Sequence, residues 1–277
     1  MSARSPLINV MANAATKAAR ALARDFGEVE NLQVSRKGPA DFVSAADLKA
    51  EKILRGELAH ARPNFGFLME ESGAETGADK DQRWIVDPLD GTTNFLHGIP
   101  HFAISIALEH FGKVVAGLVY QPINDEMYWA EKGRGAWLNG RRLRSSARRD
   151  LAQAVVATGI PHLGRGDHPE FLAILERIMP RVAGVRRFGA AALDLAYVAS
   201  GRLDGFWETH LQTWDIAAGA LIVREAGGYV SDFAGGSDFA RSGEIIAAND
   251  QLHGPLARLV SEGRQFAAKQ SVEKTDS

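Results

Sequence analysis

Two aspartates three residues apart carry the clearest chemical signal in this sequence. Asp87 and Asp90 follow the apolar run 84–86. Proline and leucine separate them, so the end of a predicted strand turns both carboxylates toward one point. Two like charges this close raise each other's pKa unless a cation neutralises them. A hard divalent cation such as Mg²⁺ takes carboxylate and carbonyl oxygens, so the pair, with the Leu89 carbonyl as a further oxygen, predicts a Mg²⁺ site.

A run of small polar residues follows the second aspartate. Gly91, Thr92 and Thr93 offer backbone N–H groups and hydroxyls at a predicted helix start, an arrangement that favours anion binding. Metal carboxylates beside a phosphate cradle indicate phosphoryl chemistry. The alternative is that the Asp-Pro and Asp-Gly pairs are only turn signals, which is the ordinary interpretation of either pair alone.

Further acids stand at the ends of other predicted elements. Glu70 follows the apolar run 65–69, and Asp215 follows Trp214 at a predicted helix start. Taken alone, the first is typical of a solvated turn and the second of a first-turn acid that satisfies the helix dipole. Strand ends that deliver acids to a common edge are where α/β proteins build their sites.

The apolar pattern predicts the elements that must position these residues. The expected strands are 65–69, 83–86, 104–109, 114–121, 126–130, 154–158, one near Val185, 203–208, 229–232 and 245–248. The expected helices are 7–22, 45–60, 169–179, 190–200 and 215–226. The turn residues of 31–43 predict a loop.

These elements predict an α/β (α+β) protein with two halves in one compact catalytic unit. An N-terminal α+β half, residues 1–145, carries the metal and phosphate motifs, and a C-terminal α/β half, residues 146–265, carries Asp215. From Gly263 the chain is polar without a periodic apolar face, so residues 266–277 are expected to form a disordered tail.

The composition excludes several classes of function. The 277 residues are 45% hydrophobic and 24% charged with a net charge of −2, which is typical of a globular protein and gives no global attraction to nucleic acid. The absence of cysteine excludes disulfides, zinc–thiolate sites, iron–sulfur clusters and a cysteine nucleophile. No apolar run reaches the roughly 18–20 residues of a membrane helix, so no membrane partner is expected.

Taken in order along the chain, the motifs resemble the inositol monophosphatase family of Mg²⁺-dependent, lithium-sensitive phosphatases. The likeness extends from Leu7 to about Leu259. The matching stretches are 41–47, 69–72, 84–94, 189–192, Glu208, 214–219 and 225–228. The resemblance implies a layered α/β/α/β/α sandwich of the sugar-phosphatase type.

The resemblance also implies roles for individual residues. One Mg²⁺ would be held by Glu70, Asp87 and the Leu89 carbonyl, and a second by Asp87, Asp90 and Asp215, with two or three ions per site. The implied catalytic residues are Asp47, Thr92 and Glu70, of which Thr92 with Asp47 would orient and deprotonate the attacking water. The implied phosphate and substrate contacts are Asp90, Gly91, Thr92, Thr93, Ala191, Glu208 and Asp215.

The resemblance favours hydrolysis of myo-inositol 1-phosphate to inositol and phosphate in the cytoplasm by a homodimer that Li⁺ inhibits. The chain departs from the family pattern at Met69, at Thr209 and His210, and in carrying both Arg36 and Lys37. These departures leave the ligand set intact but leave the substrate open. Fructose 1,6-bisphosphate, adenosine 3′,5′-bisphosphate and histidinol phosphate are the alternatives with the same mechanism.

Two other features suggest different functions. His97 and His101 have a helical metal-ligand spacing, but Gly98 and Pro100 break the helix, so loop or core histidines are expected. The basic run 141–149 suggests an RNA-binding or protein-binding regulatory module. It contains no interleaved aromatic residues for base stacking, so nucleic acid is not the expected partner.

Overall fold

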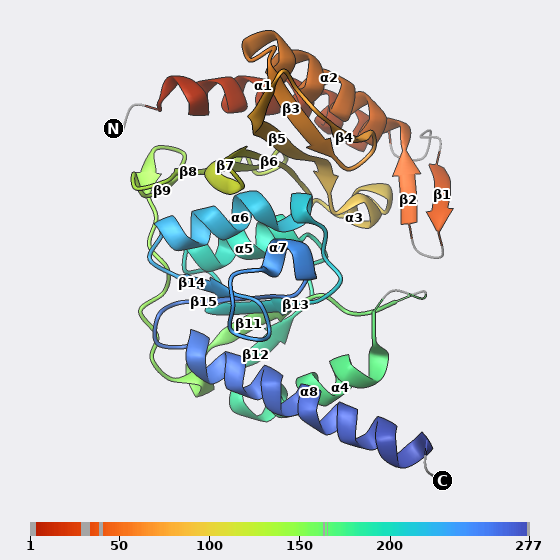
Figure 1. Cartoon of the computed structure of the whole chain (residues 1–277), viewed down its shortest axis with the longest axis vertical. Helices are drawn as coiled ribbons and strands as arrows, with labels where there is room; N and C mark the ends of the chain where they lie inside the picture. Colours follow the sequence, from red (N-terminus) through yellow and green to blue (C-terminus); the bar gives the residue numbers. More distant parts are fainter. Residues whose placement is uncertain (1–3, 29–33, 39–40, 163, 165, 276–277) are drawn as a thin grey trace.

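Helices and sheets alternate in five layers along the long axis of the molecule (Figure 1). The computed structural model describes residues 4–28, 34–38, 41–162, 164 and 166–275. Helix pairs form the first, third and fifth layers, and the two large sheets form the second and fourth. The pairs are α1 (Pro6–Phe26) with α2 (Ala45–Ala61), α5 (Ala191–Ala199) with α6 (Thr213–Glu225), and α4 (His168–Ile178) with α8 (His253–Thr275). This order confirms the predicted α/β/α/β/α sandwich.

The eight-stranded sheet contains the predicted meander. Its order is β10-β9-β8-β7-β6-β5-β3-β4; β3 and β5 are parallel, and the other neighbours are antiparallel. The strands are β3 (Phe65–Met69), β4 (Gly73–Glu75), β5 (Asp79–Asp90), β6 (Ala103–His110), β7 (Lys113–Gln121), β8 (Glu126–Glu131), β9 (Ala136–Leu138) and β10 (Arg141–Arg142).

The five-stranded sheet lies in the second half of the chain, with the order β12-β11-β13-β15-β14. Its strands are β11 (Val155–Thr158), β12 (Gly184–Arg186), β13 (Gly205–Glu208), β14 (Tyr229–Ser231) and β15 (Ile245–Ala248). Short elements complete the chain: α3 (Thr92–Leu96), α7 (Phe239–Ser242) and the 3-10 turns Leu151–Gln153 and Met179–Arg181. No helix in the described part of the chain is both long and apolar enough to cross a membrane.

The middle helix layer is packed tightly between the two sheets. All residues of α6 from Ile216 to Val223 are buried. Glycine permits the closest approaches, because a Cβ at Gly117 of β7 would lie 2.8 Å from the Ala218 carbonyl oxygen. A Cβ at Gly219 would likewise lie 2.6 Å from the Leu195 Cβ. The core therefore runs continuously through both halves and holds them in a fixed relation.

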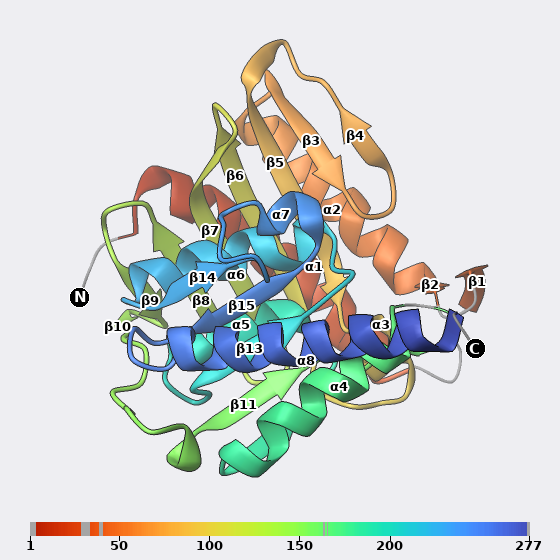
Figure 2. The ribbon, with the colours of Figure 1, turned by 60° about the horizontal axis from the view of Figure 1, so that its bottom comes forward.

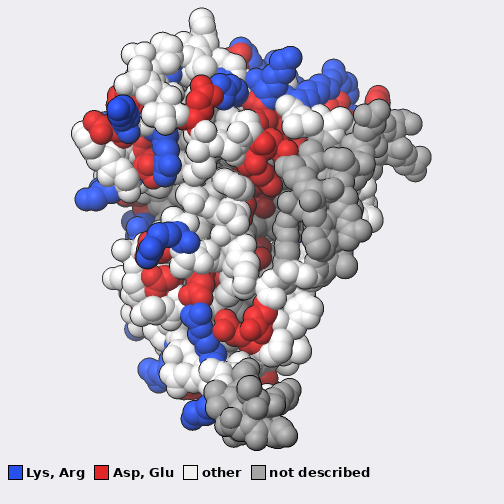
Figure 3. Space-filling view, turned by 45° about the vertical axis from the view of Figure 1, so that its right-hand side comes forward, with Lys and Arg blue, Asp and Glu red and all other residues white. Residues whose placement is uncertain are grey.

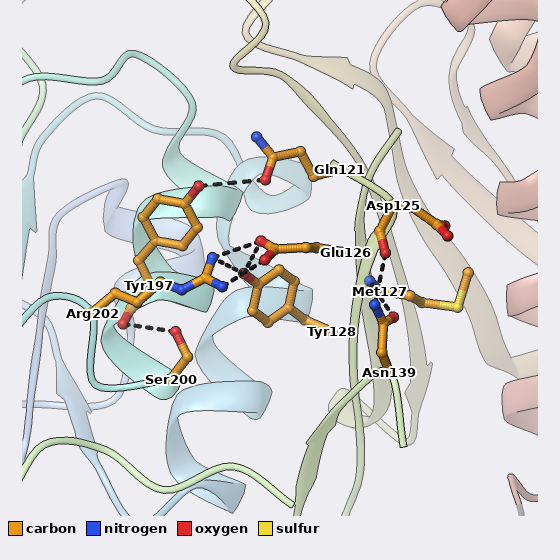
Figure 4. A network of polar contacts seen from close by, with 9 residues as sticks. All are labelled: Gln121, Asp125, Glu126, Met127, Tyr128, Asn139, Tyr197, Ser200 and Arg202. Atoms are coloured by element: carbon orange, nitrogen blue, oxygen red, sulfur yellow. Dashed lines mark hydrogen bonds and ion pairs between the residues drawn. The ribbon is translucent and has the colours of Figure 1, made fainter. Parts of the chain in front are cut away.

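A polar network also joins the two halves near the chain reversal after α5 (Figure 4). The Arg202 guanidinium donates to both carboxylate oxygens of Glu126 on β8, at 2.6 and 2.5 Å. The Tyr128 hydroxyl donates to the same carboxylate at 2.7 Å. These bonds lower the pKa of Glu126, so the carboxylate is held ionised.

The predicted disordered tail is wrong for most of its length. Helix α8 continues to Thr275, and it lies beside α4 in Figures 1 and 2. A Cβ at Gly263 would lie 2.5 Å from the Ile174 Cα, and Ala267 is buried one turn later. Arg264 adds ion pairs to Glu170 at 3.4 Å and to Glu244 at 2.6 Å. From Gly263 onward the helix is therefore held by close approach of small residues and by charge, neither of which produces an apolar period.

The predicted loop 31–43 is also partly wrong. The strands β1 (Val34–Gly38) and β2 (Asp41–Ser44) pair antiparallel, while residues 31–33 and 39–40 lie outside the described part. The two short strands carry too few apolar residues to predict from their pattern.

Candidate active site

The two motif aspartates lie where β5 departs from regular pairing. Asp87 stands opposite Ser105 on β6 and Asp90 opposite Ala103, so the register shifts between the two aspartates. Proline, which lacks an N–H, occupies this irregular stretch. The Leu89 N–H donates to the Asp87 Oδ1 at 2.9 Å. The bulge therefore bends both carboxylates to one side of the strand end, as predicted from the sequence.

The residues after Asp90 turn back over the same point. Gly91 has a φ of 93°, in the left-handed region that glycine adopts readily. A Cβ there would also lie 3.0 Å from the His101 carbonyl oxygen. The Thr92 hydroxyl donates to the Leu89 carbonyl at 3.0 Å. This contact places the Thr92 hydroxyl next to the Leu89 carbonyl, which is predicted from the sequence to be a metal ligand.

Asp90 connects this turn to the other half of the molecule. Its Oδ2 accepts the Ala192 N–H at 2.8 Å. Ala190, which precedes α5, has no side-chain oxygen to cap that helix, so a carboxylate from the distant β5 does so. Burial raises the pKa of Asp90 to about 7, although the backbone N–H groups at the start of α5 act in the opposite direction.

Four carboxylates converge on Asp87. Its side chain is 2% exposed, and its pKa is raised well above the ordinary value, first by burial and then by the charges of Glu70, Asp90 and Asp215. Asp47, buried on α2, adds a weaker effect of the same sign. Such a concentration of buried acids is costly unless protons or a cation neutralise it.

Glu208 supplies a carboxylate from the end of β13. A Cβ at Gly159 would lie 1.8 Å from the Glu208 Oε1, so the carboxylate occupies the space that only glycine leaves at that position. Burial raises the pKa of Glu208 to about 8; the Asp215 charge acts in the same direction and the Arg187 charge opposes it. The carboxyl group is therefore largely protonated near neutral pH and can both donate and accept hydrogen bonds.

Two adjoining cavities contain the predicted site. The smaller, of about 160 Å³, is lined by all the predicted site residues except Asp47: Glu70, Asp87, Leu89, Asp90, Gly91, Thr92, Thr93, Ala191, Glu208 and Asp215. The larger, of about 590 Å³, shares Glu70, Glu208 and Asp215 with it. Figure 3 shows acidic side chains along a furrow on this side of the molecule.

Two predicted site residues, Asp47 and Asp215, do not simply line a cavity. Asp47 does not line either cavity but lies close enough to Asp87 to raise its pKa. Asp215 lines both cavities and at the same time accepts the Gln212 N–H at 2.7 Å in a capping box at the start of α6. Asp215 is therefore a first-turn acid of α6 and, at the same time, a residue of the cavity walls.

Several residues at the site were not selected from the sequence. The buried Asn94 amide donates to the carbonyls of His101 and Phe188, both at 2.8 Å, and so ties the turn 91–93, the predicted phosphate loop, to the segment before α5. Arg187 and His162 line the smaller cavity. Asn94 could have been selected from the sequence, because it lies inside the 84–94 motif. The other two come from segments that only the tertiary fold brings to the site.

The histidine pair 97 and 101 does not form a site. His101 stacks on Phe188 with ring centroids 5.1 Å apart, and burial lowers its pKa to about 4, while His97 is exposed. The interpretation as loop and core histidines agrees with this arrangement.

The donor atoms around the smaller cavity suit Mg²⁺. They are carboxylate and carbonyl oxygens and a hydroxyl, without sulfur or imidazole among the predicted ligands. Among the described residues, no group of three or more histidine, aspartate or glutamate side chains is arranged so that it could already hold a metal ion. Mg²⁺ typically takes only a few carboxylates and keeps several waters, so this open set of oxygens fits it.

Comparison with known proteins gives matches over nearly the whole chain. The model of the inositol monophosphatase family matches residues 3–265. An inositol-1-monophosphatase of Mesorhizobium japonicum is 60% identical over 94% of this chain and 98% of its own length. The Nus factor SuhB of Escherichia coli K12 is 43% identical over 89% of this chain and 92% of its own. The crystal structure of the extragenic suppressor protein suhB from Bartonella henselae superposes with a TM-score of 0.91 at 61% identity, covering 94% of this chain and 100% of that one.

Proposed function

Because the chain belongs to the inositol monophosphatase family, we propose that it hydrolyses a small polyol phosphate, with myo-inositol 1-phosphate as the leading substrate and Mg²⁺ as cofactor. The observation that carries this proposal is the cavity that collects Glu70, which follows β3, and the acids of β5 and α6 beside the Gly91–Thr93 turn. Acids that can bind a divalent cation stand there next to backbone N–H groups that can bind phosphate.

In this proposal the carboxylates divide between two ions. Glu70, Asp87 and the Leu89 carbonyl hold one, and Asp87, Asp90 and Asp215 hold the other. Bound there, Mg²⁺ lowers the pKa of water and stabilises charge on the phosphoryl and leaving oxygens. Burial and the neighbouring acids raise the pKa of Asp87, and burial raises that of Asp90, so protons compete with a cation for these groups.

The remaining residues orient the reactants. The Thr92 hydroxyl, fixed against the Leu89 carbonyl, orients the attacking water, and the Asp47 carboxylate, near Asp87, takes up its proton. The backbone N–H groups of the 91–93 turn bind the phosphate oxygens. Glu208 and the Ala191 backbone contact the hydroxyls of the leaving group, and the protonated Glu208 carboxyl can donate as well as accept there.

The direct test is phosphate release from myo-inositol 1-phosphate at increasing Mg²⁺, by the wild-type protein and by the Asp87→Asn variant. The proposal predicts Mg²⁺-dependent turnover that the variant loses. Equal turnover by the two proteins would contradict the ligand assignment.

A second candidate function is binding of an RNA or protein partner. It is supported by the E. coli relative that is named a Nus factor and by the basic run 141–149. Arg148 of this run pairs with the buried Asp204 at 3.0 Å, and Arg142 lies over the Trp137 ring. Exposed Arg141, Arg144 and Arg149 are therefore the residues to replace with serine, with loss of partner capture and retained turnover as the supporting result.

Two properties stay predictions. The expected homodimer is tested by size-exclusion chromatography with light scattering, and the expected cytoplasmic location by fractionation of the source cells. Inhibition by Li⁺ is part of the proposed mechanism, and phosphate release measured with Mg²⁺ plus Li⁺ tests it.

A further inference from the structure

A buried hydroxyl connects the large sheet to the start of α6. Ser105 on β6 is 1% exposed, and it is the one polar side chain in the buried stretch 103–108 of that strand. A hydroxyl costs free energy to bury unless it forms a hydrogen bond. The Ser105 hydroxyl donates to the main-chain carbonyl of Trp214 at 3.1 Å, across 109 residues of the chain. The proposed function assigns no role to this contact.

On the strand side, Ser105 lies beside the first of the motif aspartates. Ala103 and Ala107, two residues before and after it, belong to the core cluster that contains α6, and alternate residues of a strand share a face. Ser105 therefore faces the middle helix layer. In the antiparallel register it stands directly opposite Asp87 on β5. Directly opposite side chains lie on one face with their Cβ atoms about 4.5–5.5 Å apart, so the serine flanks the Asp87 carboxyl group.

On the helix side, the acceptor lies next to another proposed metal ligand. Trp214 directly precedes Asp215 in the first turn of α6, where the Asp215 carboxylate accepts the Gln212 N–H at 2.7 Å. Burial is the main reason that the pKa of Asp87 is raised, and the charge of Asp215 adds to it, so the two carboxylates lie close together. The serine hydroxyl thus joins the surroundings of Asp87 to the backbone that carries Asp215.

The apolar contacts of α6 do not fix its position as precisely. A Cβ at Gly117 of β7 would lie 2.8 Å from the Ala218 carbonyl oxygen, one turn after Trp214, so the helix rests directly on the sheet. Apolar burial is non-directional and sets how closely the helix approaches the sheet. A hydrogen bond requires a narrow range of distance and angle. The Ser105 hydroxyl therefore determines where the first turn of α6 lies along the strands.

We propose that Ser105 is a positioning residue for the Mg²⁺ ion that Asp87, Asp90 and Asp215 hold in the proposed function, on which this inference rests. Its hydroxyl fixes the first turn of α6 on β6 and so sets the separation of the Asp87 and Asp215 carboxylates. Ser105 is not among the described residues that line either cavity, so its loss leaves every ligand in place but changes their spacing. Mg²⁺ requires near-octahedral geometry and therefore binds more weakly when its ligands are displaced.

The test measures Mg²⁺ binding without substrate by isothermal titration calorimetry, and phosphate release from myo-inositol 1-phosphate as Mg²⁺ is raised. Ser105→Ala removes only the hydroxyl oxygen. The matched control is Ser231→Ala on β14, because that serine is also buried and donates to a main-chain carbonyl, that of Asp232, at 2.8 Å. Ser231 is likewise not among the described residues that line the two cavities. Melting in EDTA measures what each hydroxyl contributes to the fold.

We expect Ser105→Ala to raise the Mg²⁺ dissociation constant, and the Mg²⁺ concentration for half-maximal turnover, by roughly tenfold. KM for the ester at saturating Mg²⁺ should be nearly unchanged, because no substrate contact is lost. Ser231→Ala should also lower the melting temperature in EDTA but leave both Mg²⁺ values unchanged.

Two results would overturn the inference: unchanged Mg²⁺ values in Ser105→Ala, or an equal rise in Ser231→Ala. In either case, Mg²⁺-dependent turnover by the wild type would still uphold the proposed function. Absence of Mg²⁺ binding and of Mg²⁺-dependent turnover in the wild type would overturn both.

Discussion

The Asp90 carboxylate accepts the Ala192 N–H at 2.8 Å, which joins the end of β5 to the start of α5 across 102 residues. One oxygen of a proposed metal ligand thus caps the helix that carries the proposed substrate contact Ala191. This hydrogen bond therefore fixes the proposed metal end and the proposed leaving-group end of the site relative to each other.

Asp90→Asn should remove activity without removing the fold. The asparagine oxygen can still accept the Ala192 N–H, but the negative charge that a cation needs is lost. We expect phosphate release to fall by at least roughly a hundredfold. Because burial raises the pKa of Asp90, loss of its charge should not lower the melting temperature measured by circular dichroism. Asp250→Asn, at an exposed aspartate, is the control, and near-normal turnover by Asp90→Asn would refute the two-ion assignment.

Stability without divalent cations should fall as pH rises. Burial raises the pKa of Asp87, that of Asp90 to about 7 and that of Glu208 to about 8. Between roughly pH 4 and these values the native state binds more protons than the unfolded chain, so the free energy of unfolding decreases with pH. Melting in EDTA at about pH 5.5 and about pH 8 checks this.

The same melting experiment can also compare the effect of Mg²⁺ at the two pH values. Mg²⁺ should raise the melting temperature more at about pH 8 than at about pH 5.5, because fewer protons compete for the carboxylates. Asp90→Asn should show a shallower decrease in EDTA than the wild type. A steeper decrease in the variant would be inconsistent with the raised pKa of Asp90.

Asn94→Asp should impair catalysis by loosening the phosphate loop. The amide donates to two carbonyl oxygens at 2.8 Å, and a carboxylate would face both of them with an acceptor. A displacement of the loop by a fraction of an ångström is expected to lower kcat by roughly ten- to a hundredfold. Steady-state kinetics check this against Asn9→Asp, an exposed control on α1. Unchanged kcat in a folded Asn94→Asp protein would speak against the positioning role.

Gly159→Ala should displace Glu208. The added methyl group would lie 1.8 Å from the carboxylate oxygen, so the side chain has to leave its position. We expect KM for the polyol phosphate to rise by roughly tenfold, with a smaller effect on kcat. The matched control is Gly56→Ala on the exposed face of α2, which has open space at its Cβ and should raise stability by about 0.5 to 1 kcal/mol. Equal kinetics in the two variants would count against the proposed role of Glu208.

Local patterns predicted much of the architecture. The strands Phe65–Met69 and Ile245–Ala248 match their predicted bounds, because each is a short buried run between turn residues. Helix α8 was not among the predicted helices, and its end was expected to be a disordered tail. The close approach of Gly263 to α4 depends on the absence of side-chain bulk rather than on a hydrophobic period.

Part of the candidate site could likewise be predicted from the sequence, and part could not. Asp87 and Asp90 are close in sequence, so their convergence was predictable from a strand end and a proline. The contacts of Asn94 with Phe188 and of Glu208 with Gly159 join segments that are far apart in the chain. No spacing rule predicts such contacts, because the first exists only once the two halves have packed together and the second only once β11 and β13 have paired.

The central claim is that the converging carboxylates support metal-dependent hydrolysis of a polyol phosphate. The most direct measurement is phosphate release from myo-inositol 1-phosphate, fructose 1,6-bisphosphate, adenosine 3′,5′-bisphosphate and histidinol phosphate, each with Mg²⁺, with EDTA and with Mg²⁺ plus Li⁺. We predict release from myo-inositol 1-phosphate that requires Mg²⁺, stops in EDTA and decreases with Li⁺. Release that persists in EDTA, or no release from any of the four, would contradict the claim.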